Sequence, residues 1–220
     1  MKEKQIYPFL DERIENYCNE HLSEEPQHLR EISRKTFLKY VKPQMISGNW
    51  QGGFLRLISK IAKPKKILEI GTFTGYATLS LADGLQEGGK IYTIEKDEIY
   101  RDFLEEMINK YGYSSMVELI FGDALDIIPS LNEDFDIIFI DANKAKYPQY
   151  YKMCINKLNL GGLIIADNIL WYGKVGLEIM PNDKQTAAID EFNKLITEDS
   201  NVENLIIPIR DGLMIGRKIK

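Results

Sequence analysis

Residues 66–76 read Lys66-Ile67-Leu68-Glu69-Ile70-Gly71-Thr72-Phe73-Thr74-Gly75-Tyr76, and this stretch gives the clearest indication of the fold. An apolar run leads into a loop bounded by Gly71 and Gly75, after which the chain continues as a helix. Short apolar runs of this kind are typical of strands buried in a parallel sheet, and glycine-bounded loops that follow them are typical of nucleotide-type turns. The stretch therefore predicts the first strand of an α/β sheet, with a ligand bound at the carboxyl end of that strand.

The rest of the chain repeats the same alternation. After Pro64, short apolar runs alternate with amphipathic stretches, which is the pattern of an α/β domain. Strands are predicted at residues 66–70, 90–95, 117–121, 136–141, 163–167, 205–209 and 213–217, and helices before Pro64 at residues 11–20, 24–40 and 51–62. The last two strands are joined only by residues 210–212, which are too few for a parallel crossover, so they must form a hairpin. The result is a mostly parallel sheet that contains one antiparallel strand.

Length and composition predict a single domain over residues 1–220. With 220 residues, 44% of them apolar and 28% charged, the chain is long enough to bury one full sheet. Residues 1–63 are expected to supply helices that cover the site, and residues 64–220 the ligand-binding core. No apolar run approaches the length of a membrane span, and residues 1–13 lack a signal-peptide core, so a cytoplasmic protein with no membrane partner is expected.

Charge and cysteine content exclude several kinds of site. The net charge of −5 gives no general footprint for nucleic acid, and the cluster Arg30, Arg34, Lys35, Lys39 and Lys42 is interpreted first as a solvated helix face. Cys18 and Cys154 lie far apart without a partner motif, so neither a disulfide framework nor a zinc site is predicted. Both are expected to be buried thiols.

Acidic residues end two of the predicted strands. Asp141 follows one apolar run, and Asp167 with Asn168 follows the next. If these strands are neighbours, about 4.8 Å apart, the three side chains can converge on one hard cation. Ligation by oxygen alone favours Mg²⁺, with Mn²⁺ or Ca²⁺ as alternatives. The competing interpretation is that these residues only cap the helices that follow.

The glycine loop differs from a dinucleotide-binding loop. Its spacing is Gly71-x-x-x-Gly75, and Glu69 just before it would repel a phosphate but suit a cofactor with an ammonium or sulfonium group. S-adenosylmethionine has these properties. Glu95 ends the second strand, where an acid can accept hydrogen bonds from ribose hydroxyls, and Gly122-Asp123-Ala124 follows the third strand, where adenine would lie.

Several further segments carry a family resemblance. They are Met45 with Gly52-Gly53-Phe54-Leu55, Leu68-Glu69-Ile70-Gly71 with Thr74-Gly75-Tyr76, Phe139-Ile140-Asp141-Ala142 with Lys144, Asp167-Asn168 with Leu170-Trp171, and Pro208 with Asp211-Gly212-Leu213. From about Met45 to the C-terminus the chain resembles the metal-dependent class I O-methyltransferases, which include catechol and caffeoyl-CoA O-methyltransferases and bacterial relatives.

The resemblance implies a Rossmann-like fold, a seven-stranded sheet in the order 3-2-1-4-5-7-6 with helices on both faces, and a homodimer. It implies cofactor contacts from Ser47, Glu69, Gly71, Thr72, Ala77, Glu95, Ala124 and Asp141, and metal ligation by Asp141, Asp167 and Asn168. Without it, Glu69 and Gly71 are a strand end and a turn, and Ser47 is a helix cap. Asn143 stands where relatives often have an acid or a histidine, so adenine contacts there are expected to differ.

Methyl transfer to a phenol needs an oxygen that carries negative charge. A divalent cation that chelates two adjacent oxygens lowers the pKa of the attacking hydroxyl and orients it. Lys144, three residues after Asp141, could then accept the proton as a general base, and Asp141 would take part through the metal. A metal charge and burial would lower the pKa of Lys144, whereas the two carboxylates would raise it. The alternative is an ordinary surface lysine.

Three functions follow from these residues. The first is methylation of a small vicinal-dihydroxy aromatic, with Trp171 and Tyr172 as a wall for a flat substrate or, alternatively, with Trp171 in the core. The second is methylation of 5-hydroxyuridine in tRNA, which some bacterial relatives perform. The third is a non-enzymatic cofactor-binding module. Plant enzymes that act on CoA esters carry a basic, tyrosine-rich stretch where this chain has residues 184–192, so a CoA ester is not the expected substrate.

Overall fold

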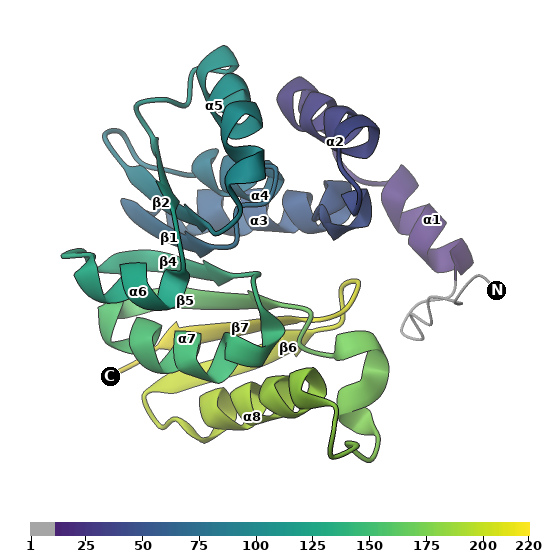
Figure 1. Ribbon diagram of the computed structural model, residues 1–220, viewed down its shortest axis with the longest axis vertical. Coiled ribbons are helices and arrows are strands. Elements are labelled where there is room, and N and C mark those ends of the chain that lie inside the picture. The colour runs from purple at the N-terminus through teal and green to yellow at the C-terminus, as the bar shows by residue number, and fades with distance from the viewer. Residues whose placement is uncertain (1–11) are drawn as a thin grey trace.

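The computed structural model describes residues 12–220 and shows a seven-stranded sheet in the order β3-β2-β1-β4-β5-β7-β6 (Figure 1). Its strands are β1 (Lys66–Ile70), β2 (Lys90–Glu95), β3 (Val117–Phe121), β4 (Phe135–Ile140), β5 (Leu158–Asp167), β6 (Val202–Ile207) and β7 (Leu213–Lys218). The pairs among β1 to β5 are parallel, whereas β7 is antiparallel to both of its neighbours. The predicted fold class, strand order and terminal hairpin are confirmed.

Helices cover both faces of this sheet. They are α1 (Glu12–Glu20), α2 (Gln27–Lys39), α3 (Gly48–Ala62), α4 (Tyr76–Ala82), α5 (Arg101–Lys110), α6 (Ala124–Ile127), α7 (Tyr147–Cys154) and α8 (Lys184–Glu198), with short 3-10 turns between several of them. Because side chains of a strand alternate between its faces, Ile67 packs with α3 and α4, whereas Leu68 packs in the cluster that contains α6, α7 and α8. The sheet is therefore apolar on both sides, as the continuous apolar runs predicted.

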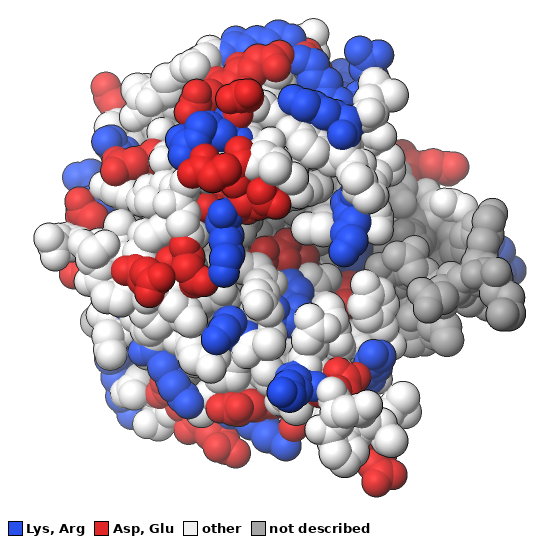
Figure 2. Space-filling model, in the orientation of Figure 1, with Lys and Arg blue, Asp and Glu red and all other residues white. Residues whose placement is uncertain are grey.

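The N-terminal helices add a further layer. Leu29 and Ile32 of α2 pack with Leu79 of α4 and Phe103 of α5 in a third buried cluster, beyond the α4 side of the sheet. The other face of α2 carries four residues of the basic cluster, where Arg30 pairs with Glu24 and Lys35 with Glu31 and Glu106. On the side drawn in Figure 2, Lys and Arg alternate with Asp and Glu. These four residues form a solvated helix face, as predicted, whereas Lys42 lies beyond the end of the helix at Lys39.

Several predicted boundaries were wrong. β5 begins at Leu158 rather than residue 163, because the strand runs through Gly161 and Gly162 with a register shift against β4. β6 begins at Val202 and ends at Ile207, because this edge strand is largely exposed and its polar residues hide the strand pattern. The predicted start of the first helix, Asp11, lies outside the described residues.

The other two N-terminal helices also begin at different residues than predicted. α2 starts at Gln27, after Pro26, and α3 starts at Gly48, not at residues 24 and 51.

The two cysteines differ in burial. Both are free, but only Cys154 is buried as predicted, whereas Cys18 is partly exposed on the outermost helix. Over residues 12–220, no helix combines the length and the apolar character that a membrane span requires.

Candidate active site

A cavity of about 650 Å³ opens at the carboxyl ends of β1, β4 and β5. One side is formed by the loops that follow these strands, and the opposite side by residues 42–47, which precede α3. Among the residues predicted from sequence, the cavity is lined by Ser47, Gly71, Thr72, Ala77, Asp141, Lys144, Asp167, Asn168, Trp171 and Tyr172. The sheet therefore brings both halves of the predicted site to one cavity.

The two acids arrive side by side because their strands are neighbours. Ile140 of β4 pairs with Ala166 of β5, so Asp141 and Asp167 leave the sheet at the same level. Neither acid caps a helix. Asn143 caps the turn Lys144–Lys146 by accepting a hydrogen bond from the Ala145 N–H at 3.1 Å, and Asp167 Oδ1 accepts from the adjacent Asn168 N–H at 2.7 Å. The interpretation of Asp141 and Asp167 as simple helix caps is wrong.

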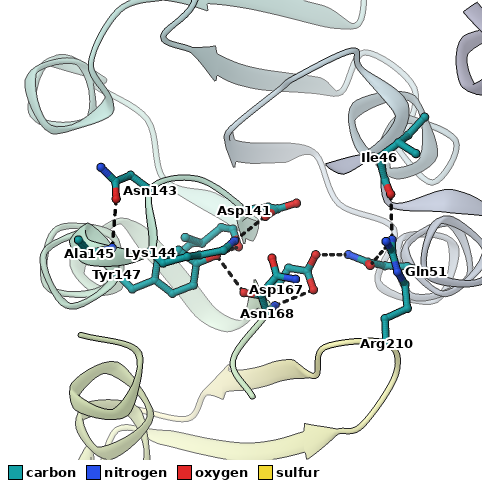
Figure 3. A network of polar contacts seen from close by, with 11 residues as sticks. Ile46, Gln51, Asp141, Asn143, Lys144, Ala145, Tyr147, Asp167, Asn168 and Arg210 are labelled. Carbon is teal, nitrogen blue, oxygen red and sulfur yellow. Dashed lines mark hydrogen bonds and ion pairs between the residues drawn. The ribbon is translucent and has the colours of Figure 1, made fainter. Parts of the chain in front are cut away.

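Lys144 is buried against the acids, with only 8% of its surface exposed. Its Nζ donates to Asp141 Oδ1 at 2.7 Å and to the hydroxyl oxygen of Tyr147 at 2.6 Å (Figure 3). Burial acts to lower the pKa of Lys144, but the charges of Asp141 and Asp167, together with the Tyr147 hydroxyl, outweigh it and raise that pKa. Lys144 is therefore a charged, fixed ammonium group at the cavity wall and not a surface lysine.

Tyr147 lies beneath this pair and is completely buried. Its hydroxyl lies 2.9 Å from the carbonyl oxygen of Asp167 and 3.2 Å from that of Ile140. Because the hydroxyl accepts from Lys144 while its own proton faces these carbonyls, Tyr147 ties the lysine to the ends of both strands.

The charge around Asp167 is not fully balanced. Burial, and then repulsion from Asp141, raise the pKa of Asp167. Lys144 supplies one positive charge to two carboxylates, and Gln51 Nε2 adds a neutral donor to Asp167 Oδ2 at 2.8 Å. Asn168, at a left-handed φ of 59°, follows directly and also lines the cavity. This donor set, two carboxylates and an amide, fits a hard divalent cation.

The donors at this site do not form a conventional cluster of charged metal ligands. Within residues 12–220, no group of three or more His, Cys, Asp or Glu is placed to hold a metal. A cation at Asp141 and Asp167 would therefore take its remaining ligands from Asn168, water or a substrate, an arrangement that is ordinary for Mg²⁺.

The glycine loop brings the chain close to Asp141. Gly71 has a φ of +101°, and a Cβ atom there would collide with the backbone carbonyl of Asp141. Only glycine adopts this φ readily and also lacks the Cβ atom that would collide. Ser47 stands at the N-terminal cap position of α3, but its side chain makes no capping hydrogen bond, so its hydroxyl is available at the cavity.

Three of the predicted cofactor residues, Glu69, Glu95 and Ala124, are not among the cavity-lining residues. Glu69 is fully buried and accepts hydrogen bonds from Thr78 and Thr93, and burial raises its pKa to about 8. Since Thr93 gives its proton to Glu69, Thr72 must be the donor in the 2.6 Å contact between the two threonines. Glu69 therefore does not line the cavity, but hydrogen bonds through Thr93 connect it to Thr72, which does.

Glu95 and Ala124 lie at the neighbouring strand ends. Glu95 accepts from the N–H groups of Phe73 at 2.7 Å and Asp97 at 2.8 Å, and burial raises its pKa. Its carboxylate therefore braces the glycine loop. Ala124 is buried at the start of α6.

An unusual backbone presents the aromatic wall. Trp171 and Tyr172 both have left-handed φ angles, 46° and 56°, and Gly173 follows at 77°. The Tyr172 N–H donates to Asp211 Oδ1 at 2.6 Å, which ties this turn to the hairpin between β6 and β7. Trp171 both packs against the main core cluster and lines the cavity.

Comparison with known proteins identifies the family. A family model described as O-methyltransferase matches residues 19–219. The chain belongs to the O-methyltransferase family. A caffeoyl-CoA O-methyltransferase of Populus kitakamiensis is 33% identical over 206 residues, which cover 89% of this chain and 88% of the relative. A catechol O-methyltransferase of Niastella koreensis is 31% identical over 200 residues, covering 89% of this chain and 90% of that protein.

Solved structures are similar over nearly the whole O-methyltransferase chain. The SAH-bound methyltransferase PaMTH1 of Podospora anserina has a TM-score of 0.86 and 28% identity, with 94% of each chain covered. The O-methyltransferase of Bacillus cereus, in complex with SAH, has a TM-score of 0.81 and 30% identity, covering 94% of this chain and 97% of that one.

Sequence reasoning missed two polar residues of this O-methyltransferase. Gln51 is buried beside Asp167, and Arg210 reaches the cavity from the hairpin between β6 and β7. Neither belongs to a motif, and 159 positions separate them. Only the folded chain brings them together. The available signal was the spacing of Gln51 four residues before Leu55, which puts it on the buried face of α3 that also carries Ser59.

Proposed function

We propose that this protein is an S-adenosylmethionine-dependent and divalent-metal-dependent O-methyltransferase that acts on a small vicinal-dihydroxy aromatic compound. The observation that carries the proposal is the pairing of Asp141 and Asp167 with Lys144 next to the glycine loop, in the cavity wall that faces residues 42–47. Such a cavity can hold a methyl donor and an acidified hydroxyl next to each other.

The cofactor end is proposed to use Ser47, Gly71, Thr72 and Ala77 directly. The loop offers no basic residue for a phosphate, and a positively charged cofactor would favour ionisation of the buried acids Glu69 and Glu95 behind it. Glu95 is proposed to accept hydrogen bonds from ribose hydroxyls, and Ala124 would border the adenine. Two structural relatives hold SAH, the product of this cofactor, which supports the assignment.

Asp141, Asp167 and Asn168 are proposed to hold the cation, and Asp141 also borders the cofactor. When bound, the cation would lower the pKa of a chelated substrate hydroxyl and orient it toward the methyl group. Lys144 lies where it can contact the same hydroxyl. Since the neighbouring carboxylates keep its pKa high, Lys144 accepts a proton only where their charge is neutralised, and otherwise it holds the substrate oxygen as a donor.

The substrate end favours a compact aromatic. Trp171, Tyr172 and Met45 line it and offer apolar area for a flat ring. The stretch of residues 184–192 forms part of α8 and brings Gln185 to the cavity in place of a basic, tyrosine-rich segment, which argues against a CoA ester. The comparisons lend no support to the tRNA alternative.

The test is transfer of a labelled methyl group from S-adenosylmethionine to 3,4-dihydroxybenzoate, with Mg²⁺ and again with EDTA. The proposal predicts transfer with Mg²⁺ and none with EDTA. 4-Hydroxybenzoate, which has a single hydroxyl and cannot chelate, is the matched control and is expected to remain unmethylated. Equal transfer in EDTA would remove the metal from the proposal, and absence of transfer in both conditions would remove the substrate class.

A further inference from the structure

Arg210 connects three parts of the site that are far apart in sequence. It lies in the turn between β6 and β7, and its Nη1 donates to the carbonyl oxygens of Ile46, at 2.9 Å, and Ser47, and to Gln51 Oε1 at 3.3 Å (Figure 3). Ile46 and Ser47 belong to residues 42–47, which cover the cavity and are called the covering segment below. One guanidinium group therefore holds the covering segment and the side chain of Gln51 at the same time.

The backbone at Arg210 indicates that its side chain is needed. Arg210 has a φ of 52°, in the left-handed region where glycine is the residue of lowest conformational cost. A side chain kept at such a position, although glycine would fit the turn better, is expected to compensate through its contacts.

Gln51 continues the connection toward the acids. It is 1% exposed, and while its Oε1 accepts from Arg210, its Nε2 donates to Asp167 Oδ2 at 2.8 Å. An amide is suited to this position because it accepts on one side and donates on the other without adding charge. Asp167 is thus linked, through two side chains, to the segment that contains Ser47.

We propose that Arg210 and Gln51 act as positioning residues that couple the two ends of the site. A cofactor that contacts Ser47 fixes the covering segment, the segment fixes Arg210 and Gln51, and Gln51 fixes the Asp167 carboxylate for a cation. By thermodynamic reciprocity, a cation at Asp167 then raises the affinity for the cofactor by the same factor as the cofactor raises the affinity for the cation. This inference rests on the proposed cofactor and metal sites and adds a residue-level link between them.

Calorimetric titration with SAH, in EDTA and in saturating Mg²⁺, tests the link without measuring activity. In the wild type, Mg²⁺ is expected to tighten SAH binding by about fivefold or more, the lower end of ordinary coupling. In Arg210→Gly and in Gln51→Met the ratio of the two dissociation constants is expected to fall to about one. Arg217→Met is the matched control, because Arg217 lies on the same hairpin but pairs with surface Glu203 at 3.0 Å. It should keep the wild-type ratio.

Thermal unfolding separates this role from a purely structural one. Arg210→Gly removes the left-handed strain, so its melting temperature should match or exceed that of the wild type even though coupling is lost. If Arg210→Gly does not fold, Gln51→Met decides alone.

Two results would overturn the link while leaving the proposed function intact. These are SAH binding that Mg²⁺ does not tighten in the wild type, and coupling that persists in either folded variant, since cutting one link of a series should break it. Failure of the wild type to bind SAH in either condition would instead overturn the proposed cofactor, and the link with it.

Discussion

Lys144 is held by charge on one side and by a buried hydroxyl on the other, and the proposed chemistry depends on it most directly. Lys144→Ala is expected to lower kcat by about tenfold or more, because a group that moves or donates a proton at the reacting oxygen typically contributes at least that much. SAH affinity should not change, because Lys144 borders the substrate end. Lys146→Ala, two positions along, is the control, and full turnover in Lys144→Ala would remove Lys144 from the reaction.

Glu69 makes stability depend on pH. Burial raises its pKa from 4.5 to about 8, so the native state favours the protonated acid. The stability that this contributes is fully present below pH 4.5 and is lost as the pH rises through 8. Glu69→Gln, which mimics the protonated form, should therefore resist urea better than the wild type at pH 9 but similarly at pH 4.5.

The control for this prediction is Glu118→Gln on β3, where the side chain is exposed and pairs with Lys90. It should show no comparable gain at pH 9. A Glu69→Gln variant that is equally destabilised at every pH would mean that the carboxylate is ionised in the native state.

At the level of elements, the strands were predictable wherever burial dictates their sequence. β1 and β2 lie in the interior of the sheet and have the predicted bounds, because such strands are mostly apolar and glycine or charged residues mark their ends. The edge strand β3 also has the predicted bounds. β6 lies at the edge, where Glu203 and Asn204 face solvent without cost, so its first half carries no such pattern. The starts of α2 and α3 were each misjudged by three residues, because the first helical turn does not coincide with the start of the apolar repeat and no capping side chain marks it.

The C-terminus of α3 offers a test of element stability. Lys63 follows the helix at a left-handed φ of 48°, and its N–H donates to the Ser59 carbonyl at 2.8 Å. Lys63→Gly should stabilise the fold by about 0.5–1 kcal/mol, since glycine adopts this conformation without a Cβ clash. Lys60→Gly, inside the same helix, should destabilise it by about 1 kcal/mol. Urea denaturation measures both, and a loss of stability in Lys63→Gly would contradict the argument.

At the scale of the whole molecule, the sequence predicted those site residues that lie at the carboxyl ends of the sheet strands. Asp141 and Asp167 follow apolar strands, and parallel strands present their carboxyl ends at one edge, so their meeting could be expected from the pattern alone. Arg210 and Gln51 come from a turn and a helix whose mutual position depends on how the N-terminal layer packs over the sheet. No local sequence pattern indicates that packing. The connection that Arg210 and Gln51 make between the two ends of the site could therefore be recognised only in the folded structure.

A cofactor held between the sheet edge and residues 42–47 should stabilise the whole protein. SAH would contact both the glycine loop after β1 and the covering segment of residues 42–47, so it should bind the native state only. At a free concentration of 100 times its dissociation constant it should then raise the free energy of unfolding by about 2.7 kcal/mol. The backbone amides of residues 44–47 should also exchange more slowly with deuterium, because this segment is then fixed. If SAH raises the melting temperature but leaves amide exchange in residues 44–47 unchanged, the covering segment does not take part in cofactor binding, and Ser47 must be removed from the proposed site.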